Sequence, residues 1–266
     1  MRLLRILLIP AVACLLVMGS ATAGGAAGLA SHGQTLARVS TNQSSNWGGY
    51  MQGTIEKGGK IFTQIAGDWV VPTASQHTRG ADEYSSVWIG IGGGCLDANC
   101  LTQDQTLIQT GTEQDVAADG TPSYSAWWEI IPGPSLEITN MPVNPGDAFH
   151  ADIREVGTTG SNVWTITLTS VTRNVTFTQT VPYASGHGSA EWITETPLIL
   201  GTNAGFASMP NLGTVSFTNA QTNSASAALI ASEKIELVSG STKVVEPSNP
   251  LSATSFHDCV WSATCS

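Results

Sequence analysis

Charged residues are scarce in this sequence. Asp, Glu, Lys and Arg make up 11% of its 266 residues, against about a quarter in typical soluble domains. Only 10 are Lys or Arg, against 20 Asp or Glu, which gives a formal net charge of -10. Phosphate binding needs clustered basic residues. No such cluster occurs, so nucleic acid is excluded as a partner. Few basic groups suit an acidic medium, but an ordinary low-charge secreted protein fits this composition equally well.

The sequence also lacks an apolar run long enough to cross a membrane. Its longest run, Ile6–Met18, has 13 residues, fewer than the ~20 that a spanning helix needs. Arg2 and Arg5 precede the run, and Ala21-Thr22-Ala23 follows it at the spacing of a signal-peptidase site. We therefore predict a signal peptide over residues 1–23, a secreted, extracellular protein and no membrane partner.

Cysteine is rare, and four of the five cysteines lie beyond the predicted signal peptide. An even number in a secreted chain is typical of disulfides. Of the three connectivities we favour Cys95 with Cys100 and Cys259 with Cys265, because each closes a short loop. Zinc is the rival interpretation, but no Cys-x-x-Cys or His-Glu-x-x-His spacing occurs. We expect no metal and no cofactor.

Helical periodicity is absent over any stretch of ten or more residues, and period-two patterns dominate instead. Trp164, Ile166 and Leu168 alternate with threonines, and the alternation resumes at Val175 and Phe177 after a turn, which predicts a hairpin. Phe149 to Arg154 alternates in the same way. Further strands are expected at Gly48 to Thr54, Ile61 to Val71, Ser85 to Ile91, Thr106 to Gly111, Tyr124 to Ile131, Ala190 to Glu195, Val215 to Thr218 and Lys234 to Val238.

These strands predict an all-β fold, a two-sheet antiparallel β-sandwich, over any βαβ arrangement. The segment Ala225 to Ala231 is the one candidate for a helical turn. No linker divides the chain. We expect a short polar leader or propeptide over 24–43, a β-sandwich domain over 44–239 and a C-terminal tail with a disulfide loop over 240–266. We expect a monomer.

Common catalytic motifs are missing: there is no Gly-x-Ser-x-Gly, no phosphate loop with Lys and no metalloprotease helix. His187 and Ser189 place a base near a hydroxyl, but no third group or oxyanion loop accompanies them. The unusual feature is polar side chains inside apolar, strand-like segments. Gln109 lies in Leu-Ile-Gln-Thr-Gly, and Glu191 lies in Ser-Ala-Glu-Trp-Ile. Such residues are either structural, with hydrogen-bond partners in the core, or functional.

Aromatic residues concentrate in or beside the expected strands. Their usual place in a sandwich is the core, and the alternative is a groove that binds sugar or peptide. The residues concerned are Trp47, Trp88, Tyr124, Trp127, Trp128 and Trp192.

Seven short motifs in a fixed order carry a more specific signal. They are Ser45-Asn46-Trp47-Gly48-Gly49-Tyr50, Trp69-Val70-Val71-Pro72, Trp88-Ile89-Gly90-Ile91, Ile108-Gln109-Thr110-Gly111, Tyr124-Ser125-Ala126-Trp127-Trp128-Glu129 with Pro132, Pro145-Gly146-Asp147, and Ala190-Glu191-Trp192-Ile193. In this order they resemble the glutamic peptidase family, the eqolisins. The resemblance implies a lectin-like, concanavalin-like jelly-roll sandwich and an acid endopeptidase that acts on polypeptides.

The resemblance also implies a catalytic pair, which falls on Gln109 and Glu191. Further residues are expected to bind substrate or support this pair, namely Trp47, Trp88, Tyr124, Trp128, Glu129 and Glu113. One position departs from the family pattern: Gly92 stands where an Asp commonly follows Trp-x-Gly-Ile, so a supporting carboxylate is absent or replaced. The acidic residue after Gln-Thr-Gly is kept as Glu113.

A Gln and a Glu can together cleave a peptide bond. Glu191 would act as general base toward water and then as general acid toward the leaving nitrogen. Gln109 would hold that water and donate its amide N–H to the oxyanion. A carboxylate beside a neutral amide escapes like-charge repulsion, so we expect Glu191 to stay ionised in acid if donors surround it.

Two other functions stay open at this point. A carbohydrate-binding, lectin-like module without catalysis would use the same aromatics, since a fold does not fix function. A glycoside hydrolase would pair Glu191 with Glu129 or Glu195. Glu191 and Glu195 lie about 13 Å apart along one strand, too far for either glycosidase geometry, whereas Glu129 is not excluded in this way.

Overall fold

The computed structural model describes residues 29–200 and 205–266, so the predicted signal peptide lies outside the described residues. Within these two ranges the chain consists of β-strands and turns, and its one helical element is the short 3-10 helix η1 (Ala231–Glu233). No helix in the described part of the chain is long and apolar enough to cross a bilayer.

One layer of the fold carries both candidate catalytic residues. Each strand is antiparallel to its neighbours, and the order across the layer is β9 (Leu136–Glu137), β8 (Pro122–Ile130), β7 (Leu107–Val116), β6 (Ser86–Gly92), β13 (Ser189–Glu195), β4 (Trp47–Gly53) and β18 (Lys234–Ser239). The three strands β6, β13 and β4 are buried at every residue. Both faces at the centre of this layer are therefore covered.

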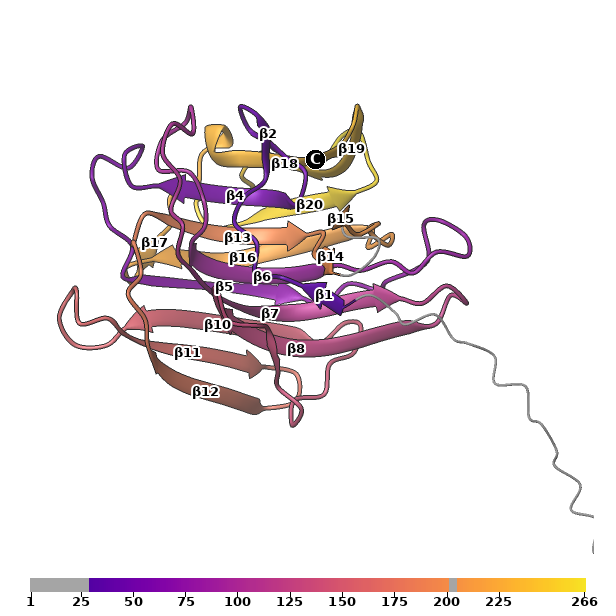
Figure 1. Cartoon of the computed structure of the whole chain (residues 1–266), viewed down its shortest axis with the longest axis horizontal. Helices are drawn as coiled ribbons and strands as arrows, with labels where there is room; N and C mark the ends of the chain where they lie inside the picture. Colours follow the sequence, from indigo (N-terminus) through magenta and orange to yellow (C-terminus); the bar gives the residue numbers. More distant parts are fainter. Residues whose placement is uncertain (1–28, 201–204) are drawn as a thin grey trace, which may run out of the picture.

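The second layer packs against the first and is joined to it along one edge. Its order is β12 (Val175–Pro182), β11 (Val163–Ser170), β10 (Ala148–Glu155), β5 (Gln64–Val70), β16 (Thr214–Thr222), β20 (Phe256–Val260) and β19 (Thr242–Pro247). Strand β18 pairs with β4 through its first residues and with β19 through its last. The two layers thus form one continuous 17-stranded sheet that folds over on itself (Figure 1).

Short strands complete the fold. Strands β2 (Arg38–Ser40), β3 (Gln43–Ser44) and β17 (Ala225–Ser226) belong to the large sheet. A separate three-stranded sheet joins β1 (Leu29–Ser31), β14 (Leu198–Leu200) and β15 (Gly205–Phe206). In Figure 1, β1 is drawn in front of β6 and β7, and Gln109 lies on β7.

Tryptophans hold the two layers together. The Trp192 Nε1 of β13 donates to the carbonyl oxygen of Ala66 on β5 at 2.9 Å, and Trp69 Nε1 of β5 donates to Thr112 Oγ1 on β7 at 3.0 Å. Gly67 permits the close approach, because a Cβ there would come within 2.8 Å of the Trp192 indole. The predicted two-sheet antiparallel sandwich is confirmed.

The disulfides Cys95–Cys100 and Cys259–Cys265 are confirmed, and every strand expected from the sequence is present with shifted ends. Strand β7, for example, runs on to Val116.

Two expectations were wrong. The residues after 240 are not a loose tail but contribute β19 and β20, with Val245 and Phe256 fully buried. The segment Ala225 to Ala231 is not a helical turn, because it begins with β17 and reaches η1 only at its last residue.

Candidate active site

Gln109 and Glu191 lie in one register row of the first layer. Glu191 on β13 pairs with Gly90 on β6, Gly90 pairs with Gln109 on β7, and Gln109 pairs with Glu129 on β8. Directly paired residues point to the same face of a sheet, and strands lie about 4.8 Å apart, so the Cα atoms of Glu191 and Gln109 are separated by roughly 10 Å. Their side chains therefore extend from the same face with only Gly90 between them.

Gly90 lets the side chains of Trp88 and Leu107 pack against the backbone between the pair. A Cβ at this position would lie 2.9 Å from Cζ3 of Trp88 and 3.1 Å from Cδ1 of Leu107. Real Cβ atoms essentially never approach closer than 3.0 Å. Any larger residue at position 90 would thus displace the wall of the site.

The Gln109 amide is oriented by hydrogen bonds on its nitrogen. Nε2 donates to Glu129 Oε2 at 2.8 Å and to the carbonyl oxygen of His32 at 2.9 Å. Its Oε1 is buried and has no hydrogen-bond partner among residues 29–200 and 205–266. Burial raises the pKa of Glu129 to about 7, against the opposing effect of the nearby His32. Gln109 therefore offers a fixed donor and a free acceptor.

Glu191 is fully buried, and neither carboxyl oxygen has a hydrogen-bond partner within the described ranges. Burial raises its pKa well above the usual value, the neighbouring Ser189 hydroxyl works against this rise, and the charge of Asp104 adds to it. The raised pKa favours the protonated carboxyl in this closed state. Ionisation in acid was expected only if donors surround the carboxylate, and among the described residues they do not.

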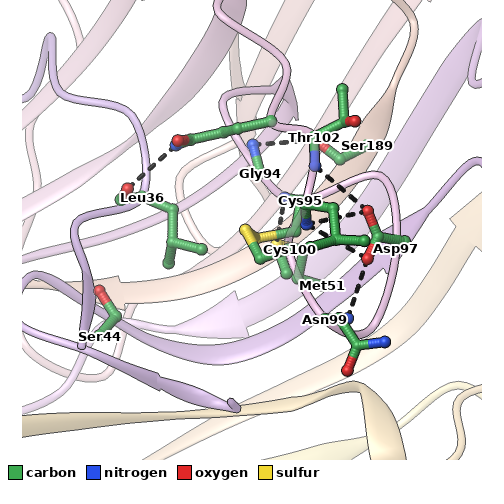
Figure 2. The surroundings of a disulfide bond; sticks show 12 residues. Leu36, Ser44, Met51, Gly94, Cys95, Asp97, Asn99, Cys100, Thr102 and Ser189 are labelled. Carbon is green, nitrogen blue, oxygen red and sulfur yellow. Dashed lines mark hydrogen bonds between the residues drawn. A yellow bond between two sulfur atoms is a disulfide. The ribbon is translucent and has the colours of Figure 1, made fainter. Parts of the chain in front are cut away.

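A disulfide-closed loop covers Glu191. Figure 2 shows Gly94, Met51 and Ser189 grouped around the Cys95–Cys100 bond. A Cβ on Gly94 would lie 2.6 Å from Glu191 Oε1, and the Gly94 N–H donates to Ser189 Oγ at 3.0 Å. The loop backbone thus lies directly against the carboxylate.

Asp97 fixes the shape of this loop. Its carboxylate accepts backbone N–H bonds from Asn99 at 3.0 Å and from Thr102 at 3.2 Å, as the dashed lines in Figure 2 show. The disulfide and the Asp97 contacts together make the loop a defined wall of the site.

The glycine at position 92 is required by the backbone. Gly92 has φ +93°, a conformation that L side chains rarely adopt, and its Cβ would collide with the carbonyl oxygen of Thr106. An Asp therefore cannot replace it without a backbone change. Asp104 is the nearby carboxylate that acts on the pKa of Glu191 in this chain.

A second row of polar residues lies four positions along the same face. It runs from Glu195 on β13 through Ser86 on β6 to Glu113 on β7. The Glu195 carboxylate accepts the indole N–H of Trp88 at 2.8 Å and that of Trp47 at 3.2 Å. Both tryptophans are thus held in place by a buried carboxylate beside the row that contains Gln109.

Four of the expected supporting residues share the face of Gln109 and Glu191, namely Trp47, Trp88, Glu113 and Glu129. Tyr124 and Trp128 do not. They pair with Gln114 and Thr110, point to the opposite face and pack on the main core, because side chains alternate along a strand. The expectation that they line the site is corrected accordingly.

Three residues that the structure brings to this face were not among those expected to bind substrate or support the pair: His32, Trp127 and Glu195. Trp127 was named only among the aromatics of the strands, and Glu195 only as a possible glycosidase partner of Glu191. The period of two could have indicated Trp127, two residues before Glu129, and Glu195, four residues after Glu191. No local signal indicated His32.

Other chemistries find no support within the described ranges. His187 Nε2 contacts Glu155 Oε2 at 3.1 Å, and Ser189 Oγ accepts from Gly94, so no Ser–His pair forms. Among residues 29–200 and 205–266, no group of three or more His, Cys, Asp or Glu could hold a metal ion.

Comparisons with known proteins agree with the motifs. Aspergillopepsin-2 of Aspergillus niger is 26% identical over 201 residues, which cover 68% of this chain and 65% of that protein. The chain thus matches slightly less than two thirds of that relative's length.

Solved structures show the same fold. The structure of scytalido-glutamic peptidase with a transition state analog inhibitor superimposes with a TM-score of 0.59 at 21% identity, covering 81% of this chain and 98% of that chain. Aspergilloglutamic peptidase from Aspergillus niger gives a TM-score of 0.51 at 23% identity, covering 67% and 99%. The model of the Peptidase A4 family matches residues 45–261. The chain therefore belongs to the Peptidase A4 family, the glutamic peptidases.

Proposed function

We propose that this protein is a secreted endopeptidase that hydrolyses polypeptides in acid through Gln109 and Glu191. The observation that carries the proposal is the register row Glu191–Gly90–Gln109, in which an amide oxygen and a carboxyl group, both buried and free of partners among the described residues, extend from one face. Membership of a peptidase family favours this function over a sugar-binding module or a glycoside hydrolase.

The proposed reaction uses one water molecule. Ionised Glu191 takes a proton from the water, whose oxygen adds to the peptide carbonyl carbon. Gln109 positions the water through Oε1 and donates from Nε2 to the oxyanion, an effect worth roughly 10²–10³-fold for one donor. Glu191 then returns the proton to the leaving nitrogen as the C–N bond breaks, and such proton transfer contributes about 10²–10⁴-fold.

The Glu191 carboxyl must lose its proton before it can act as a base. Burial raises its pKa in the closed site, so the proposed acid activity requires the site to open. Water that enters an open cleft stabilises the carboxylate and brings the pKa down toward its ordinary value.

The proposal extends to the organisation of the precursor. Residues 1–23 act as a signal peptide, residues 24–43 as a leader or propeptide, and the catalytic sandwich begins near residue 44. Mass determination of the secreted, active protein tests these boundaries. Material that retains residue 2 would contradict the signal peptide.

The catalytic assignment is tested with Glu191→Gln and Gln109→Ala. Each is expected to abolish casein hydrolysis between pH 2 and 7, in the presence of pepstatin, while circular dichroism shows an intact fold. Glu137→Gln, an exposed carboxylate on β9, is the matched control and keeps full activity. Substantial turnover by either active-site variant would remove the assignment.

A further inference from the structure

The leader crosses the face that carries Gln109 and Glu191. It is fixed on one side by β1, which pairs with β14, and on the other by β2, which pairs with β3. Between them, the Leu36 N–H donates to the carbonyl oxygen of Gly93 at 3.0 Å, and Gln103 Nε2 donates to the carbonyl oxygen of Leu36 at 3.0 Å. The leader is thus bonded to the same loop that covers Glu191, and the site is closed.

The His32 side chain of the leader fills a polar pocket in this face. Nε2 contacts Glu113 Oε1 at 2.5 Å, and Nδ1 lies 3.3 Å from Ser86 Oγ and 3.5 Å from Glu195 Oε2. The imidazole stacks on Trp127, with the ring centroids 4.4 Å apart and the planes at 13°, and the residue is only 1% exposed. Two carboxylates at the edge and an indole against the flat side suit a planar cation.

The backbone of His32 occupies a position that matters for catalysis. Its carbonyl oxygen accepts from Gln109 Nε2 at 2.9 Å, and the proposed function assigns this same N–H to the oxyanion of a substrate. The following residue is Gly33, where a Cβ would lie 3.0 Å from Glu129 Oε1. The leader therefore presents a carbonyl to the catalytic amide and a histidine side chain to the adjacent pocket.

We propose that the pocket formed by Ser86, Glu113, Trp127 and Glu195 selects a histidine side chain in substrates, on the carbonyl side of the bond that is cleaved, and that His32 fills this pocket as a built-in substrate mimic. The inference rests on the proposed function, because it takes Gln109 as the donor to the reacting carbonyl. The substrate class is a polypeptide with an internal histidine.

The attachment of the leader to this face depends on pH, because His32 is surrounded by groups that change their charge. The groups that face His32 are Glu113 with nearby Asp115 on β7, Glu195 on β13, Ser86 on β6, and Glu129 and Trp127 on β8. Burial alone would lower the pKa of His32, but the contacts with Glu113 and Glu195 raise it to about 10.

Burial alone would raise the pKa of Glu113, but the hydrogen bonds from His32 and Ser125 hold it below its usual value. The ion pair is complete above the lowered pKa of Glu113 and below the raised pKa of His32. It is lost as the pH falls through the Glu113 value, so the leader is held at neutral pH and loosened in strong acid.

The first test removes the mimic from the full-length chain. His32→Ala loses a charge-assisted contact, so the initial rate on a short peptide at pH 6 is expected to rise by about tenfold. His150→Ala is the matched control, since His150 contacts Asp68 on the second layer in a similar way. Hydrogen exchange at the Leu36 amide is the second measurement, and it should be faster in His32→Ala alone. If His32→Ala changes neither the rate of peptide hydrolysis nor the hydrogen exchange of Leu36, His32 does not act as a substrate mimic.

The second test compares peptides that differ in one residue, with His, Phe, Leu or Glu at the centre of an alanine-rich chain. The full-length His32→Ala protein, assayed at pH 5, above the lowered pKa of Glu113, is expected to cleave the His peptide about tenfold faster, after the histidine by mass spectrometry. Glu113→Gln should erase most of that preference. Equal rates for the four peptides, or cleavage at a bond other than the one after the histidine, would refute the proposal that the pocket selects histidine.

The two levels of the proposal fail in different ways. If casein is hydrolysed in a Glu191-dependent manner but the histidine preference is absent, only the pocket is wrong. If Glu191→Gln retains activity, the catalytic assignment fails, while the hydrogen exchange of Leu36 still reports whether His32 anchors the leader.

Discussion

Asp258 on β20 is a buried acid whose replacement tests how this fold responds to acid. The residue is 0% exposed, and Thr194 Oγ1 donates to its Oδ2 at 2.8 Å. Burial raises its pKa from 3.8 to about 8, against the opposing effect of the Thr194 hydrogen bond. Between these two values the folded protein keeps a proton that the unfolded chain releases.

The sign and size of the effect follow from proton linkage. A carboxyl whose pKa is raised in the folded state makes the fold lose stability as the pH rises, by about 1.4 kcal/mol per pH unit for one proton. From pH 5 to pH 7 this amounts to about 2.7 kcal/mol. Asp258→Asn removes the titrating group and keeps an oxygen that accepts from Thr194. The free energy of unfolding of the variant should therefore fall less steeply as the pH rises.

Urea unfolding at pH 5, 6 and 7 measures the difference. The other buried acids, including Glu191, are common to both proteins, so they cancel when the two slopes are subtracted. Glu137→Gln, exposed on β9, is the control and follows the wild type. Parallel curves for the wild type and Asp258→Asn would refute the argument that burial keeps Asp258 protonated.

Three further outcomes follow from the packing. Gly94→Ala places a Cβ 2.6 Å from Glu191 Oε1, so kcat falls about 100-fold, whereas Gly205→Ala, with open space around it, keeps its kcat. Trp192→Phe removes the bond to Ala66 and leaves a void, so the free energy of unfolding falls by about 2 kcal/mol, as measured in urea. The double change Cys259→Ser and Cys265→Ser opens a short loop, so the free energy of unfolding falls by about 2 kcal/mol. An unchanged thermal unfolding temperature would contradict the stabilising role of this disulfide.

The sequence alone predicted the fold class and the likeness of the site to a family. Period-two alternation identified the strands, and Gln109 and Glu191 stood out because polar side chains interrupt apolar strands. What alternation cannot supply is register between strands. Tyr124 and Trp128 were therefore expected to bind substrate or support the pair although they point to the opposite face, whereas Glu129, in the same strand, shares the face of Gln109.

The missed residues have a related cause. His32 and Glu113 are 81 positions apart, and only tertiary packing brings the leader onto the sheet. The leader was expected as a separate polar segment because nothing near His32 in the sequence shows that its ring is buried. The last strands were missed because Pro247 and Pro250 made the segment resemble a loop, whereas β19 ends at Pro247 at the end of its ladder.

Gln109 and Glu191 stand in one row of a hydrogen-bonded sheet, on two strands separated by β6, rather than on loops. Their spacing is therefore set by backbone geometry that varies little while the sheet exists. Heat should consequently inactivate the protein in a single step that coincides with global melting. Sequence drift in the surrounding loops, by contrast, can change which polypeptides reach the pair without altering the distance between its members.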